Sequence, residues 1–223
     1  SEGSGPLFYP HAVKLVEEAR RLPTLFRQKA TRARLNMAIM PDLSRRRLAG
    51  LLRRVQGVLP ELDLTLSDYG TPADCRLTLD ALRREDEIFL PLWEENYVLC
   101  VPVGHPLASR ERLPLAELQH YDFIECPPCE AHQQTIGLLA CDRLTLNLVA
   151  KAESKGLVMA LVLAGVGISF LPDGLVEDEA GLCTLPVSGP RMFRRIGLCY
   201  PAHQTLNPAL RALIPELAGQ GAS

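Results

Sequence analysis

The sequence lacks an excess of charge of either sign. Its 24 lysines and arginines stand against 26 aspartates and glutamates, a formal net charge of -2 at pH 7. A chain that holds DNA by its overall field needs a clear positive excess, so we expect DNA-contacting residues to lie outside this chain. Long apolar runs are also missing, and the first residues show no signal-peptide pattern, so we predict neither a membrane span nor a secretion signal.

The sequence also lacks a disulfide framework and the common catalytic motifs. Its 7 cysteines are odd in number and scattered, several of them in apolar stretches, which favours a reducing, cytoplasmic setting. It contains no Gly-x-Ser-x-Gly elbow, no P-loop and no dinucleotide fingerprint. We therefore expect a protein that is not an enzyme and that holds neither a metal nor a cofactor.

What the sequence does contain is a regular alternation of strand and helix patterns. An amphipathic helix over Pro10–Leu22 would be a connector, a dimerisation helix or an ordinary terminal helix. Apolar residues then alternate over Leu35–Met40, a capped leucine-rich helix follows, and Leu62–Leu66 alternates again. This β-α-β opening is typical of an α/β protein. We predict later elements over residues 97–103, 115–119, 122–125, 130–140, 144–150, 155–164, 168–171, 195–200 and 207–217.

Arginines surround the apolar face of the first predicted α/β helix. The chain has no aromatic residues between them, so a solvated outer face or a dimer contact explains them better than nucleic-acid binding. The five are Arg45, Arg46, Arg47, Arg53 and Arg54.

Three segments together resemble the effector-binding domain of LysR-type transcription regulators. LNMAIM at 35–40, followed by a helix and VLPELDL at 58–64, is similar to that family's first β-α-β unit. VLCVPVGHPLA at 98–108 is similar to its crossing strand and the following turn. LVLAGVGISFLP at 161–172 resembles its helix-Gly-strand signature. The likeness covers almost the whole chain, including the leading helix, which resembles the family's linker.

The resemblance implies an α/β fold of two Rossmann-like lobes joined by two crossing strands, like a periplasmic binding protein. Residues 1–32 would hold a cloning remnant, the linker helix and a loop. Residues 33–101 with 189–223 would form regulatory lobe I, and residues 102–188 lobe II. The implied partners are a small-molecule effector, carboxylates being one candidate class, and DNA held by an N-terminal winged helix-turn-helix absent from this chain. The regulator would be a homodimer or homotetramer without a membrane partner.

One region departs from the family. Between Asp68 and Cys75 there is no room for the usual helix. Either that helix is lost, or Ala73–Glu85 is the helix and the next strand is missing. Alternation of Cys75, Leu77 and Leu79 favours a short strand over Cys75–Leu79.

The resemblance places the first ligand contacts at Pro41, Asp42 and Ser44. Asp42 and Ser44 are also ordinary helix N-caps, which by itself explains them. A carboxylate at position 42 would repel an anionic ligand, so the site would suit a less anionic or a cationic effector. Two further contacts are Ser154, by default a helix cap, and Asp80, by default a solvated turn residue.

Cys126 and Cys129 stand at the family's second ligand loop, before a predicted helix. As a pocket wall they fit well. As a redox switch they would need one thiol of lowered pKa, because the thiolate is the reactive form. As a metal site with His132 they would lack a fourth ligand. The favoured function is an effector-binding regulatory domain; the alternatives are a thiol sensor on the same fold and a solute-binding protein.

Overall fold

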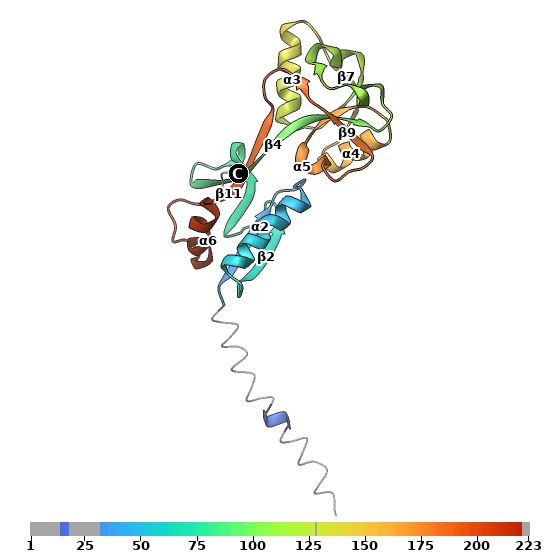
Figure 1. Cartoon of the computed structure of the whole chain (residues 1–223). Coiled ribbons are helices and arrows are strands. Elements are labelled where there is room, and N and C mark those ends of the chain that lie inside the picture. The colour runs from blue at the N-terminus through green and yellow to red at the C-terminus, as the bar shows by residue number, and fades with distance from the viewer. Residues whose placement is uncertain (1–13, 18–31, 128, 220–223) are drawn as a thin grey trace, which may run out of the picture.

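The computed structural model describes residues 14–17, 32–127 and 129–219 and contains two hydrophobic cores (Figure 1). We call the part around the first core, which includes Leu35, Leu77 and Leu213, lobe I, and the part around the second, which includes Leu99 and Phe170, lobe II. The predicted helix over Pro10–Leu22 lies outside the described residues except for residues 14–17, which are helical and exposed.

Strands and helices alternate along most of the chain. The strands are β1 Arg34–Ile39, β2 Asp63–Asp68, β3 Cys75–Leu79, β4 Glu87–Pro102, β5 Leu113–Pro114, β6 Asp122–Glu125, β7 Asn147–Lys151, β8 Ser169–Pro172, β9 Leu182–Leu185, β10 Val187–Ser188 and β11 Phe193–Pro201. The α-helices are α2 Arg45–Val58, α3 Glu130–Cys141, α4 Lys155–Leu163, α5 Asp173–Val176 and α6 Pro208–Ala218, and short 3-10 helices cover Asp80–Leu82, Pro106–Ser109 and Leu115–His120.

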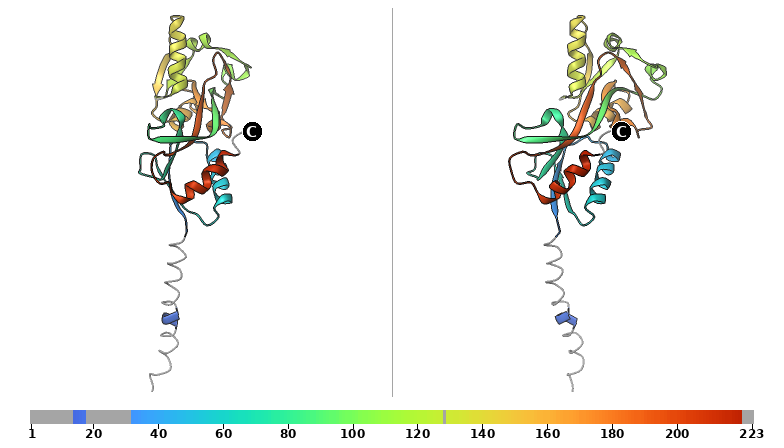
Figure 2. Two further views of the ribbon diagram at one scale, coloured as in Figure 1. Left: turned by 90° about the vertical axis from the view of Figure 1, so that its left-hand side faces the viewer. Right: turned by 60° about the vertical axis from the view of Figure 1, so that its left-hand side comes forward.

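The sheet of lobe I has the strand order β2-β1-β3-β11-β4. Strand β1 is parallel to β2 and β3, and β11 is antiparallel to β3 and β4. Helices α2 and α6 contact each other, and Figure 2 shows them side by side against this sheet. Each helix begins at a side-chain cap, Ser44 for α2 and Asn207 for α6, as expected for these residue types. Leu51 and Val55 of α2 are buried, which the leucine-rich pattern predicts.

The family's helix between β2 and β3 is lost, and the short strand predicted over Cys75–Leu79 is present. Strand β3 starts beside Met37, halfway along β1, so the chain crosses from β2 to β3 within residues 69–74. Asp74 ties this crossing to Asn36: Asp74 N donates to Asn36 O at 2.9 Å, and Asn36 N donates to Asp74 Oδ2 at 2.7 Å. A staggered strand therefore removes the need for a longer connection.

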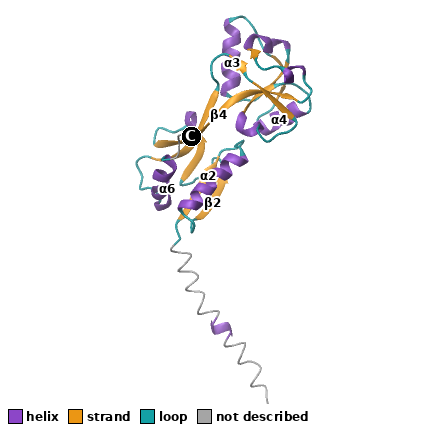
Figure 3. Cartoon of the chain, in the orientation of Figure 1, coloured by secondary structure: helices purple, strands orange, loops and turns teal. Residues whose placement is uncertain are grey.

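Strands β4 and β11 join the two lobes (Figure 3). The first part of β4 pairs with β11, and from Tyr97 onward β4 pairs with β8 and β9 of lobe II. The predicted α/β fold of two lobes joined by two crossing strands is confirmed. The exact lobe boundaries stay a prediction.

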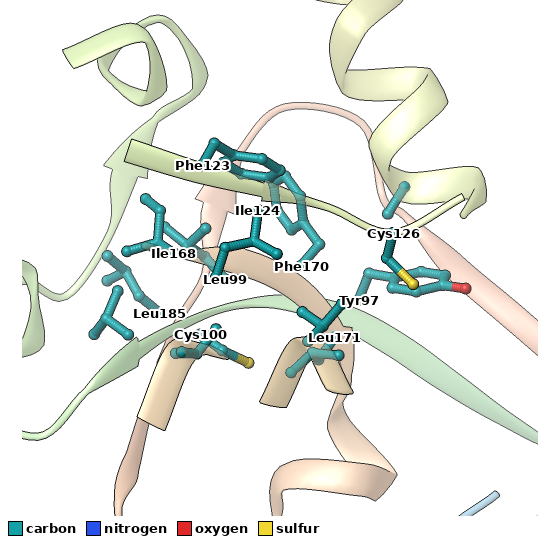
Figure 4. Close-up of a cluster of buried hydrophobic side chains, with 14 of the residues drawn as sticks. Tyr97, Leu99, Cys100, Phe123, Ile124, Cys126, Ile168, Phe170, Leu171 and Leu185 are labelled. Atoms are coloured by element: carbon teal, nitrogen blue, oxygen red, sulfur yellow. The ribbon is translucent and has the colours of Figure 1, made fainter. Parts of the chain in front are cut away.

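Lobe II encloses the larger core, whose central side chains are drawn in Figure 4. Strand β6 is parallel to β7, and β6 also bridges to Ile168 just before β8. Phe123 and Phe170 face each other with ring centroids 5.8 Å apart. Cys126 lies at one end of this cluster and points toward the ring of Tyr97 (Figure 4). None of the described helices is long and apolar enough to span a membrane.

Candidate ligand site at the junction of the lobes

Asp42, in the turn between β1 and α2, connects lobe I to lobe II. Its Oδ2 accepts a hydrogen bond from Lys155 N at 2.8 Å, and its Oδ1 accepts one from Gly156 N at 3.3 Å. Asp42 thus caps α4, in the other lobe, rather than its own helix α2. Its φ of 60° is a left-handed conformation that few residue types other than glycine, asparagine and aspartate adopt readily. The turn therefore holds the carboxylate in a defined place.

Ser44 and Ser154 cap the two helices that meet here. Ser44 is buried, and its Oγ accepts from Arg47 N at 3.3 Å. Ser154 Oγ accepts from Leu157 N at 3.3 Å, so Ser154 and Asp42 together satisfy three donors in the first turn of α4. Pro41 is exposed and lies two residues after the end of β1.

Cys126 lies beside this contact, after β6. Burial raises its pKa most, while the charge of Lys155 lowers that pKa and the charges of Cys129 and Asp42 raise it. These influences place Cys126 near the first turn of α4 and near Asp42. A raised pKa is the opposite of what a reactive redox cysteine needs.

The neighbouring His132 of α3 is buried, and neither of its ring nitrogens has a hydrogen-bond partner among the described residues. Burial lowers its pKa, which the charge of Glu125 partly offsets. Within the described part of the chain, no group of three or more His, Cys, Asp or Glu side chains could hold a metal ion. Cys126, Cys129 and His132 therefore make no metal centre there.

Asp80 is not brought to this contact. Its Oδ2 lies 3.4 Å from Arg195 Nη1, and it lines a cavity of about 320 Å³ together with Phe193, Arg194 and Arg195. Arg195 and Arg194 are consecutive residues of β11, so their side chains point to opposite faces. Arg194 contacts the Asp42 turn and also borders this cavity, whereas the Asp80 carboxylate itself is paired with Arg195.

Sequence reasoning missed the charged residues that complete the contact. Glu95 of β4 and Arg194 of β11 form a buried pair, and Arg194 Nη2 also donates to the backbone oxygen of Asp42 at 3.0 Å. Arg47 of α2 lies 3.5 Å from both Asp173 and Glu177 at α5 of lobe II. Charged residues inside apolar strand patterns were the available signal for Glu95 and Arg194.

We call this set the interlobe junction; its members are Asp42, Arg47, Glu95, Lys155, Gly156, Asp173, Glu177 and Arg194. Two of the arginines expected on a solvated face or a dimer contact therefore have partners in lobe II, since Arg46 also lies 3.5 Å from Asp178. A third, Arg54, donates from Nη2 to Leu217 O at 3.0 Å within lobe I. The junction gathers backbone donors of a helix N-terminus, an arginine and small polar caps. Such a set can recognise a small polar molecule.

The family model of the LysR substrate binding domain matches residues 28–222. The chain belongs to the LysR substrate-binding domain family. This LysR domain has the fold of the effector binding domain of QuiR in complex with shikimate, with a TM-score of 0.71 at 18% identity over 86% of this chain and 98% of that chain.

Two curated relatives of this LysR domain are named as regulators of genes. An uncharacterised HTH-type transcriptional regulator of Bacillus subtilis, YybE, is 32% identical over 58% of this chain and 45% of its own length. A hydrogen peroxide-inducible genes activator of Dickeya chrysanthemi is 26% identical over 88% of this chain and 70% of its own length. The LysR domain here thus spans less than half of the first relative.

Proposed function

We propose that this chain is the effector-binding part of a LysR-type transcription regulator and that its effector binds at the interlobe junction. The family match over residues 28–222 carries the proposal. It is supported by the position of Asp42, Ser154 and Cys126, which come from separate segments and lie around one helix N-terminus. The domain binds and does not catalyse.

Effector binding would act by favouring one arrangement of the two lobes over another. The contacts of Asp42 with α4 and of Arg47 with α5 hold the arrangement seen here. A ligand that inserts between these groups binds more tightly to an arrangement in which they are separated. It therefore shifts the equilibrium of the two lobes toward that arrangement. The proposed regulator passes this change to a winged helix-turn-helix that precedes the chain, within a cytoplasmic homodimer or homotetramer bound to DNA.

A thermal-shift screen of the reduced protein tests the proposal, with a panel of carboxylates, amines and uncharged sugars. A molecule that binds the native state raises the Tm by an amount that grows with the logarithm of its concentration relative to its Kd. We expect at least one compound to do so, and we expect Gly156→Phe, which places a ring beside Asp42, to abolish the response.

Gly137→Phe is the matched control. Gly137 is a helical residue of α3 with no atom within 4 Å of its Cβ position, so the same ring there reaches solvent and should leave the response unchanged. Loss of the response in both variants, or in neither, would remove the junction as the binding site.

A second candidate function is thiol sensing through Cys126 and Cys129. The Cys-x-x-Cys spacing at the start of α3 and the relative named for hydrogen peroxide support it, while the raised pKa of Cys126 counts against it. Counting reactive thiols before and after peroxide treatment distinguishes the two candidates. Loss of two thiols that Cys126→Ser prevents would favour the thiol sensor.

A further inference from the structure

The first turn of α4 already holds a carboxylate of the chain itself. Both oxygens of Asp42 accept backbone hydrogen bonds there, from Lys155 N at 2.8 Å and from Gly156 N at 3.3 Å. Converging N–H groups at a helix N-terminus are the usual way in which helices bind anions. Asp42 therefore stands where the carboxylate of a free ligand would stand.

A buried arginine binds the backbone of the same residue and has one side-chain nitrogen without a hydrogen-bond partner among the described residues. Arg194 Nη2 donates to the backbone oxygen of Asp42 at 3.0 Å, and Arg194 Nε donates to Glu95 Oε2 at 2.6 Å. The Arg194 side chain is 2% exposed, and its Nη1 has no hydrogen-bond partner among the described residues. Two backbone N–H groups of α4 thus hold the Asp42 carboxylate, and Arg194 holds the backbone oxygen of the same residue.

We propose that Asp42 occupies this anion site from within the chain and thereby excludes carboxylate ligands from the first turn of α4. The inference rests on the proposed function, because it names the ligand class of the same site. Asp42 reaches α4 within the same chain, through lobes that β4 and β11 hold together, so its carboxylate has an effective concentration on the order of millimolar or higher. A free carboxylate at micromolar concentration does not displace it, so the ligand is uncharged or cationic where it meets this turn.

Removal of the Asp42 carboxylate tests the proposal. Asp42→Gly suits the test because glycine adopts the φ of 60° without strain and leaves both N–H groups of α4 open. Asp42→Asn keeps the shape of the side chain and removes its charge. It replaces Asp42→Gly in the comparison if the glycine variant does not fold. Asp86→Gly removes an exposed acid from a turn elsewhere in lobe I and is the matched control.

The probe is sodium benzoate, titrated against sodium chloride of equal ionic strength. Binding is followed by the Tm and by the amide NMR signals of Lys155 and Gly156. We expect Asp42→Gly to bind benzoate roughly tenfold or more tightly than wild type, with both amide signals shifting. Asp42→Asn should bind with an intermediate affinity, and Asp86→Gly should behave as wild type.

Two results would overturn the inference: wild type binding benzoate with the Gly156 signal shifting as strongly as in Asp42→Gly, or a folded Asp42→Gly that gains nothing. The proposed function can fail separately. If wild type binds no compound of the screen while Asp42→Gly gains benzoate, the inference stands and the effector site is wrong. If wild type binds an uncharged or cationic effector and Asp42→Gly gains nothing, the inference alone fails.

Discussion

Glu95 of β4 and Arg194 of β11 lie directly opposite each other where the strands pass between the lobes, with Glu95 Oε2 2.6 Å from Arg194 Nε. Their side chains are 0% and 2% exposed, and Trp93 Nε1 donates to the second Glu95 oxygen at 3.3 Å. One hydrophobic core lies before the pair along β4 and the other lies after it. The pair is therefore a charged contact that the protein encloses between the two cores.

Glu95→Ala should lower the free energy of unfolding by about 3–5 kcal/mol, because removal of one partner leaves a buried charge without compensation. Urea unfolding measures the loss. Glu94→Ala is the control: Glu94 pairs with Arg191 and Arg195 on the exposed face of the same strand and should leave the stability close to wild type. Equal losses in the two variants would contradict the distinction between the faces.

Gly174→Ala should destabilise the fold by roughly 1–3 kcal/mol, because a methyl group there overlaps the Glu95 carboxylate and comes within 3.1 Å of Arg47 Nε. The measurement is again urea unfolding. Gly137→Ala, in α3 with no atom within 4 Å, should be neutral or gain up to about 1 kcal/mol from helix propensity. A Gly174→Ala variant as stable as wild type would contradict the close packing of Gly174 against Glu95 and Arg47.

His132 should make the protein less stable in mild acid. Burial lowers its pKa from the usual 6.5, so the unfolded chain binds the proton more readily than the folded one. Above about pH 6.5 His132 is neutral in both the folded and the unfolded chain and does not change the free energy of unfolding. As the pH falls below that value, protonation of the unfolded chain lowers the free energy of unfolding. His132→Phe should flatten the fall in unfolding free energy between pH 7.5 and 5.5.

His105, whose pKa burial also lowers, should leave part of the acid dependence in the His132→Phe variant. His203 is exposed, so His203→Phe should retain the wild-type curve. If His132→Phe and wild type showed the same pH dependence, His132 would not be the group responsible.

The cysteines should react with thiol reagents in an order set by burial. Burial raises the pKa of Cys75 and of Cys100 to about 12, and it raises that of Cys126 as well, whereas Cys141 is exposed. In native protein at pH 8 we expect Cys141 to be modified first and Cys141→Ser to remove the fast phase. Peptide mass spectrometry identifies the site, and fast modification of Cys126 would contradict the structure.

Sequence periodicity predicted the elements in which one face is buried and the other is exposed. Strand β1 and helices α2, α4 and α6 follow that rule, and their positions were predicted within a few residues. The first part of β4 inverts it: Glu87 is buried in a pair with Arg76, while Ile88 is 43% exposed. A pattern of apolar and polar residues gives no signal for a strand whose charged residues point inward.

The candidate site was predicted as a set of positions but not as a set of contacts. Asp42 and Ser154 were named, each as a possible cap of the helix that follows it. Asp42 instead binds a helix that begins 113 residues later in the chain. A contact between residues so far apart in the sequence cannot be predicted from the pattern of neighbouring residues. The resemblance also placed Asp80 among the ligand contacts; Asp80 lies beside Arg195, and its contact with a ligand stays a prediction.

The chain enters lobe II and returns from it at neighbouring points, since Tyr97 N donates to Met192 O at 2.8 Å. Everything between these two residues folds around its own core. The two ends of this segment therefore lie side by side. A segment of this kind can be exchanged between related regulators as one piece by recombination. The acids around α5 and the first turn of α4 would need to match Arg46, Arg47 and Asp42 of the recipient. A new chemical sensitivity can arise in this way without any change in the strands that join the lobes.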